Sequence, residues 1–155
     1  MIDRLKILFS ARPESSPTTS GPDDGVKRAI ATLMFMAALM DDRIDHAERE
    51  AIADSVARRF DLPPESAAAL LAEAEEEAHD ATHFQRFTAE IKNAYDDHGR
   101  CEVMEMLWRV ICADGEVHHR EANLMRRIAG LLYVTDKDSG LARQRALTAI
   151  AGDDA

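Results

Sequence analysis

The sequence has few aromatic residues, few cysteines and no long apolar run. It holds five Phe, two Tyr and one Trp, whereas methionine alone occurs seven times. A core with so few aromatic rings must rely on Leu, Ala and Met, which are good helix formers. No stretch alternates apolar and polar residues with a period of two, so strands are not expected. These patterns predict an all-α fold.

The two cysteines, Cys101 and Cys112, do not form a Cys-x-x-Cys pattern. If they share one helix, they lie about 16 Å apart along its axis, which is too far for a disulfide. We therefore expect two reduced thiols and a cytoplasmic location. No secretory signal is expected either, because Asp3, Arg4 and Lys6 break the first apolar run.

The chain also lacks a membrane-spanning run and a surplus of positive charge. Residues 29–40 are apolar apart from Thr32, but a bilayer takes about 20 such residues. This run predicts instead a helix that is buried on most sides. The 19 Lys and Arg are outnumbered by 29 Asp and Glu, for a formal net charge of −10. Nucleic-acid binding is not expected, because it depends on Lys and Arg neutralising phosphates.

No glycine-rich phosphate loop, nucleophile elbow or ordered Ser/His/Asp set is present. His79 and His83 have the spacing of the His-Glu-x-x-His zinc motif, with Asp80 in the place of the glutamate. A metal-dependent hydrolase that uses His79 and His83 is therefore a remote alternative. Asp80 and Thr82 favour a helix boundary at this point, and no third ligand follows. We accordingly predict that the protein is not an enzyme.

The N-terminal segment differs in composition from the rest of the chain. Ile2, Leu5, Leu8 and Phe9 fall on one face of a short helix and are the candidate partner-binding residues. After them, residues 10–22 hold three Pro, four Ser and two Thr, which is typical of a flexible tether. We predict that residues 1–22 are dispensable for folding and that residues 23–151 form one helical domain.

Apolar residues at helical spacing predict about seven helices in a compact bundle. The first helix covers about residues 24–40, and the second has Ile52 and Val56 in its buried stripe. A third helix follows Pro64, and its glutamates at 73 and 75–77 are expected in solvent. The fourth helix is expected to end near Gly99, and the last one near residue 150.

One element occurs twice, once in each half of the chain. The first copy is Ala38-Leu39-Met40-Asp41-Asp42-Arg43-Ile44-Asp45-His46-Ala47-Glu48, and the second is Ile111-Cys112-Ala113-Asp114-Gly115-Glu116-Val117-His118-His119-Arg120-Glu121. Each copy has an apolar helix end, an acidic turn, and a glutamate seven residues after the first aspartate. Such a repeat predicts two helical hairpins related by a pseudo-twofold axis, with Phe35 and Trp108 at matching core positions.

Carboxylates gather at both of these corners. Asp41 and Asp114 follow helix ends, where a negative charge opposes the helix dipole by about 0.3–1 kcal/mol. Asp45 and Glu48 have the spacing of a capping box, whereas His118 occupies the cap position in the second copy. Two interpretations stay open: turn and cap roles only, or a site for Ca²⁺, Mg²⁺ or Mn²⁺ built from converging carboxylates.

In the second copy, Leu107-Trp108-Arg109-Val110-Ile111 is followed by Ala113-Asp114-Gly115-Glu116-Val117 and then by Glu121. This pattern resembles the TerB family of bacterial tellurite-resistance proteins. The resemblance covers about residues 24–150, and related domains occur in membrane-anchored co-chaperones. The first copy departs from the pattern, with Asp42 where glycine is expected. The resemblance implies a compact, all-helical cytoplasmic domain linked to stress response and metal resistance, without an established catalytic activity.

The same resemblance implies which residues would bind metal. The acidic residues of the family's turns map to Asp41, Asp45, Glu48, Asp114, Glu116 and Glu121. We therefore predict a non-enzymatic stress-response domain that binds a protein partner, such as a membrane-associated stress-response component. A divalent cation at the acidic turns is the only candidate cofactor. The alternative is a protein-interaction module without metal, in which the turn acids only cap helices.

Overall fold

The computed structural model describes residues 24–41, 44–113, 115 and 117–154. These residues form seven α-helices and no strand, so the all-α prediction is confirmed. The predicted N-terminal segment, with Ile2, Leu5, Leu8 and Phe9, lies outside the described residues. The elements are α1 (Asp24–Ala38), the 3-10 helix η3 (Leu39–Asp41), α2 (His46–Phe60), α3 (Pro64–Asp80), α4 (Gln85–Ala94), α5 (Asp97–Ile111), α6 (His119–Leu131) and α7 (Asp136–Asp154).

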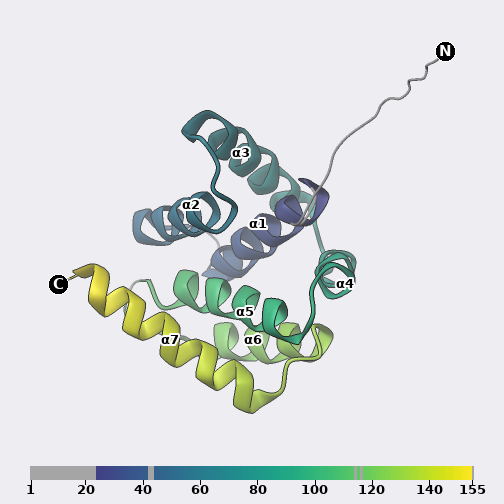
Figure 1. The fold of residues 1–155 in the computed structure, drawn as a ribbon, viewed down its shortest axis with the longest axis vertical. Coiled ribbons are helices and arrows are strands. Elements are labelled where there is room, and N and C mark those ends of the chain that lie inside the picture. Colours follow the sequence, from purple (N-terminus) through teal and green to yellow (C-terminus); the bar gives the residue numbers. More distant parts are fainter. Residues whose placement is uncertain (1–23, 42–43, 114, 116, 155) are drawn as a thin grey trace.

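Helix α1 lies at the centre of the bundle and packs against α2, α3, α4 and α5 (Figure 1). Every residue from Ala29 to Ala38 is buried. Thr32, the polar residue of this stretch, donates its hydroxyl hydrogen to the Arg28 carbonyl at 2.7 Å, so its burial leaves no unpaired hydroxyl. The prediction of a helix buried on most sides is confirmed.

Helix α5 organises the second half of the molecule. It packs along α7 and also contacts α1, α2 and α6. Leu107 and Ile111 lie in its buried face, together with Trp108. The Trp108 Nε1–H group donates to Ser139 Oγ on α7 at 3.1 Å, and both residues are buried. This bond links α5 to α7 inside the core.

The two halves of the chain follow the same order of elements. Helices α5 and α6 begin at the same sequence offset from α1 and α2, respectively. Helix α1 packs on α3, just as α5 packs on α7. Asp61 is the first residue after α2, and Tyr133 is the second residue after α6. Both have left-handed backbone angles, with φ of 51° for Asp61 and 59° for Tyr133. Superposition of the halves about a pseudo-twofold axis stays a prediction.

The expected end of the fourth helix at Gly99 is wrong. Helix α4 ends at Ala94, and Gly99 lies in the first turn of α5, where its amide donates to Oδ1 of the N-cap Asp96 at 3.0 Å. A Cβ atom at position 99 would lie 2.9 Å from the Tyr95 Cβ atom. Glycine is therefore needed here for the close approach of Tyr95, and not for ending a helix.

The acidic face of α3 is only partly in solvent. Glu73 and Glu76 are exposed as predicted, but Glu75 and Glu77 are half-buried at the edges of the packed face. Arg49 of α2 donates to Glu75 Oε1 at 2.6 Å, and Arg86 of α4 donates to Glu77 Oε2 at 2.7 Å. The hydrogen bond from Arg49 lowers the pKa of the Glu75 carboxyl. These pairs hold α3 against its neighbours, which the sequence pattern did not indicate.

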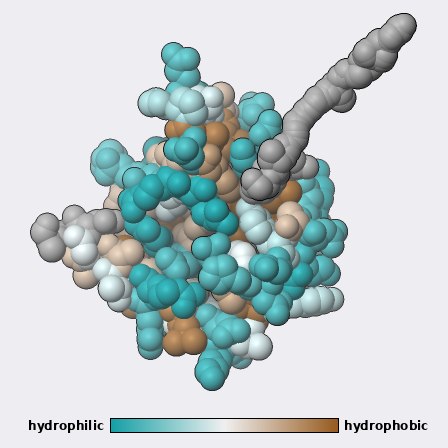
Figure 2. Space-filling view, viewed as in Figure 1, coloured by the Kyte–Doolittle hydropathy of each residue, from teal (hydrophilic) through white to brown (hydrophobic). Residues whose placement is uncertain are grey.

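The surface of the described domain is mainly polar. Hydrophilic residues cover most of the face drawn in Figure 2, with apolar areas that are small and separate. The large apolar side chains that are exposed on this part of the chain are Tyr133, Leu141 and Leu147. No described helix has the length and apolar character that a bilayer-crossing segment requires.

Candidate functional site

The first acidic corner connects α1 and η3 to α2. Asp45 is the N-cap of α2, and its Oδ1 atom accepts the Glu48 amide at 2.7 Å. In return, Glu48 Oε1 accepts the Asp45 amide at 3.1 Å. The predicted capping box is therefore confirmed. Asp45 is exposed, but Glu48 is buried, with 4% of its surface accessible.

The second acidic corner connects α5 to α6. Gly115 has a φ of +88°, which a residue with a side chain rarely adopts, so glycine allows the chain to turn here. His118 stands at the N-cap position of α6, and its amide donates to Glu121 Oε1 at 3.0 Å. Glu121 is buried, with 2% of its surface accessible. Glu48 and Glu121 thus occupy the same position in the first turns of α2 and α6.

The burial of these two glutamates is informative because ionised carboxylates are costly to remove from water. The positive end of the helix dipole favours a negative charge in the first turn, by about 0.3–1 kcal/mol. A neutral glutamine could also bond to the N-cap amide, so this bond by itself does not require an acid. The chain nevertheless has an acid at both positions, and both carboxyl groups lie inside the fold.

A hydrogen bond joins the two corners across a sequence separation of 80 residues. Arg120 of α6 donates from Nη2 to the Met40 carbonyl of η3 at 3.1 Å. Met40 lies at the C-terminal end of the first helical stretch, where exposed carbonyls attract a positive charge. The start of α6 is therefore adjacent to the end of η3, a contact that the sequence pattern had not indicated.

The structure describes three of the six predicted metal ligands in full: Asp45, Glu48 and Glu121. Asp41 is the last residue of η3, and its side chain is outside the description, as are Asp114 and Glu116. Within the described residues, no group of three or more His, Cys, Asp or Glu side chains is placed to hold a metal ion. The convergence of carboxylates from both corners stays a prediction.

The histidine pair does not have the geometry of the zinc motif. Helix α3 ends at Asp80, so His83 lies beyond the helix that carries His79. The predicted helix boundary is confirmed, and the two imidazoles do not share one helical face. His79 Nε2 lies 3.9 Å from Glu75 Oε2, one turn earlier on α3.

Both cysteines are free, as expected. Cys101 lies in α5 and Cys112 directly follows that helix. Burial, together with the negative charge of Asp138, raises the pKa of the Cys101 thiol. A raised pKa keeps the thiol protonated, and the thiolate is the form that reacts and binds metals.

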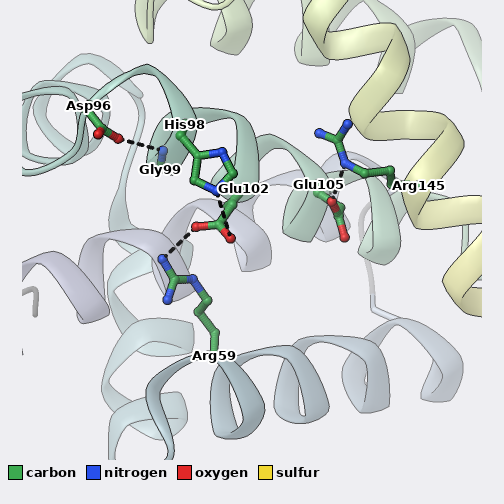
Figure 3. A network of polar contacts seen from close by, with 7 residues as sticks. All are labelled: Arg59, Asp96, His98, Gly99, Glu102, Glu105 and Arg145. Carbon is green, nitrogen blue, oxygen red and sulfur yellow. Dashed lines mark hydrogen bonds and ion pairs between the residues drawn. The ribbon is translucent and has the colours of Figure 1, made fainter.

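A polar network between α2, α5 and α7 was missed by the sequence analysis. Figure 3 shows Arg59 reaching from α2 to Glu102 on α5, where Nη2 donates to Oε1 at 3.1 Å. His98 lies one turn before Glu102, with 3.7 Å between Nε2 and Oε2. Arg145 of α7 donates to Glu105 at 2.8 Å. The sequence alone shows that His98, Glu102 and Glu105 are spaced to lie along one helix. It does not identify Arg59 and Arg145 as their partners, because these residues are distant in sequence.

Comparison with known proteins identifies the domain. The family model described as "Tellurite resistance protein TerB" matches residues 27–144. The chain belongs to the TerB family. The match extends from α1 into α7 and includes both acidic corners, so the predicted resemblance is confirmed. As a TerB-family member, the protein is a helical domain of the kind associated with tellurite resistance.

A solved structure shows the same kind of fold as this TerB domain. It is a protein of unknown function from Porphyromonas gingivalis W83, with a TM-score of 0.64 and 18% sequence identity. The alignment covers 88% of this chain and 98% of that chain. At this level of identity the similarity concerns the fold alone. A search of the curated proteins found no match.

Proposed function

We propose that this TerB-family protein is a non-catalytic cytoplasmic stress-response domain that binds a hard divalent cation at its two acidic corners. The observation that carries the proposal is the burial of Glu48 and Glu121, with 4% and 2% of their surfaces accessible, at matching positions. A carboxylate that is ionised inside a fold is costly, and a nearby cation would stabilise it.

The donor set fits such an ion chemically. Carboxylate oxygens are the ligands that Ca²⁺, Mg²⁺ and Mn²⁺ prefer. The bond from Arg120 to the Met40 carbonyl brings the two corners together, which supports a shared site. The residues that would hold the ion are the six acidic residues of the two turns: Asp41, Asp45, Glu48, Asp114, Glu116 and Glu121.

We expect calcium, magnesium or manganese to raise the melting temperature of the metal-free protein. A ligand that binds only the folded state stabilises it by about 2.7 kcal/mol at 100 times its dissociation constant. Asp114→Asn should remove this dependence. It should also leave the metal-free protein no less stable, because one charge of a repelling set is gone. Thermal unfolding followed by circular dichroism, with and without each cation, measures both effects.

Two further variants separate binding from capping. Glu90→Gln removes an exposed charge from α4 and should keep the full response to cations. Glu48→Gln keeps a side chain that serves in a capping box, so the capping interpretation expects little change in stability. If millimolar cations leave the melting temperature of the wild type unmoved, the acids are turn and cap residues only. The protein would then be an interaction module without metal.

We further propose that Ile2, Leu5, Leu8 and Phe9 bind a protein partner. The described helices already enclose one core, which supports a role outside the domain for this apolar segment. A membrane-associated stress-response component is the kind of partner that the proposal favours.

Deletion of residues 1–22 should leave the cooperative thermal unfolding of the domain unchanged, because its core is formed by α1 to α7. In a strain that lacks the gene, the full chain should restore growth on tellurite, whereas a Leu5→Glu, Phe9→Glu variant should not. Ser15→Ala, in the tether, serves as the matched control. Loss of cooperative unfolding on deletion would instead make the segment part of the core.

A further inference from the structure

A groove lies where α3, α4 and the first turns of α1 meet. Its volume is about 700 Å³, within the range of roughly 300–1,000 Å³ for protein clefts that bind ligands. Figure 1 shows the start of α1 beside the C-terminal half of α3, where Arg28 contacts Glu77. The Asp, Glu and Arg residues in the wall of the groove are Arg28, Glu73, Glu76, Glu77, Asp80 and Arg86.

The two arginines of the groove share one carboxylate. Arg86 Nη2 donates to Glu77 Oε2 at 2.7 Å, and Arg28 Nε lies 3.8 Å from Glu77 Oε1. Glu77 therefore holds the positive charge of this wall in place. Four carboxylates face two guanidinium groups in the groove, so negative charge exceeds positive charge by two.

The other three carboxylates lie along one face of α3, because Glu73, Glu76 and Asp80 are three and four residues apart. All three residues are exposed. None of them has a side-chain hydrogen bond or an ion pair with a residue that the structure describes. Like charges that line a groove repel one another and attract a positively charged occupant.

A segment of this chain has the matching charge. Residues 4–12 carry three basic residues and no acidic one, although the whole chain has a net charge of −10. The segment is also joined to the domain close to the groove. Twelve residues separate Arg12 from Asp24, which gives an average span of about 20 Å for a flexible chain. Arg28 lies only about 6 Å further along α1.

We propose that residues 4–12 dock on this groove in the free protein, with Arg4, Lys6 and Arg12 facing the three exposed carboxylates of α3. A short flexible linker gives the segment an effective concentration in the millimolar range, so even a weak contact is populated. Exposed ion pairs add little to stability, so the domain still unfolds cooperatively without the segment. The contact does not depend on the acidic corners or on a bound partner.

Nuclear magnetic resonance spectra of the isotope-labelled full chain, in metal-free buffer of low ionic strength, test the contact from both sides. Glu73→Gln, Glu76→Gln should weaken docking roughly 2- to 30-fold and shift the amide signals of residues 4–12. The matched control is Glu65→Gln, Glu90→Gln, which changes two exposed glutamates outside the groove and should leave those signals in place. Conversely, Arg4→Gln, Lys6→Gln, Arg12→Gln should shift the signals of residues 73–82.

Salt gives an independent measurement on the unchanged chain. Raising the ionic strength from about 0.01 M to about 1 M shortens the Debye length from roughly 30 Å to 3 Å. The groove signals of the wild type should then move most of the way to those of the variant without the three basic residues. Signals of residues 4–12 that respond equally to the groove variant and its control would overturn the proposal. Shifts that grow with protein concentration would also overturn it, since the segment of a second copy would then occupy the groove.

Discussion

Replacing Trp108 with alanine should lower the free energy of unfolding by about 3–5 kcal/mol, as for other buried aromatic residues. Trp108 is 6% exposed and lies where α5 packs on α7. The substitution leaves a cavity at this contact, and it leaves the buried Ser139 hydroxyl without its indole donor. Urea unfolding followed by circular dichroism measures the loss. Tryptophan fluorescence cannot be used, because Trp108 is the single tryptophan of the chain.

Two other variants separate packing from hydrogen bonding at this position. Trp108→Phe keeps most of the apolar contact and should cost only about 0.5–1.5 kcal/mol for the lost bond, plus a smaller packing term. Leu147→Ala, at a residue of α7 that is 44% exposed, should change stability by a fraction of that amount. A loss below about 1 kcal/mol for Trp108→Ala would contradict the described contact of α5 with α7.

The second large effect is expected at Phe35, in the centre of α1. Phe35 is 2% exposed within a helix that four others surround, so the structure cannot readily collapse into the space that alanine would leave. Phe35→Ala should therefore also cost about 3–5 kcal/mol. Because small domains are stable by only about 5–15 kcal/mol, this variant should unfold at markedly lower urea concentration.

Phe35→Leu is the graded control for this site. It keeps most of the apolar volume and should cost less than about 1.5 kcal/mol if the neighbours repack. Phe35 and Trp108 occupy matching positions of the two predicted hairpins. Similar losses at both would fit a repeated hairpin with one core, whereas a mild effect at Phe35 would mean that α1 is less tightly enclosed than described.

Local features of this fold could be predicted from the sequence because they depend on neighbouring residues. The capping box of α2 follows from the spacing of Asp45 and Glu48, and both of its bonds are present. The burial of α1 follows from an apolar run that is too short for a membrane. Helix α7 continues to Asp154, beyond its predicted end near residue 150, because no proline interrupts it.

Contacts between distant residues could not be predicted in this way. Gly99 was expected to end a helix because glycine often does so, but here the ring of Tyr95 packs against it. The network of Arg59 with Glu102 depends on how α2 and α5 cross, which a single sequence does not specify. Surface charges also carry no periodic signal that would identify their partners.

The local structure of the two acidic corners was predicted in part, whereas metal binding there stays a prediction. The sequence placed Glu48 and Glu121 in the first turns of two helices, and the structure confirms the predicted capping bond of Glu48. The bond from the His118 amide to Glu121 was not predicted, because histidine is a poor N-cap residue. The burial of the two glutamates was not predicted, because capping residues are ordinarily read as surface residues. The contact of Arg120 with Met40 was not predicted either, since it depends on the packing of the two halves.

The central place of α1 has a consequence for synthesis in the cell. Helix α1 leaves the ribosome before α3, α4 and α5, which are among the helices that cover it. At about 5–20 residues per second, the stretch from the end of α1 to the end of α5 takes roughly 4–15 s to synthesise. During that time the apolar surface of α1 lacks part of its cover. The nascent chain is thus most vulnerable to aggregation midway through translation, and chaperones that bind short apolar segments would act on it then.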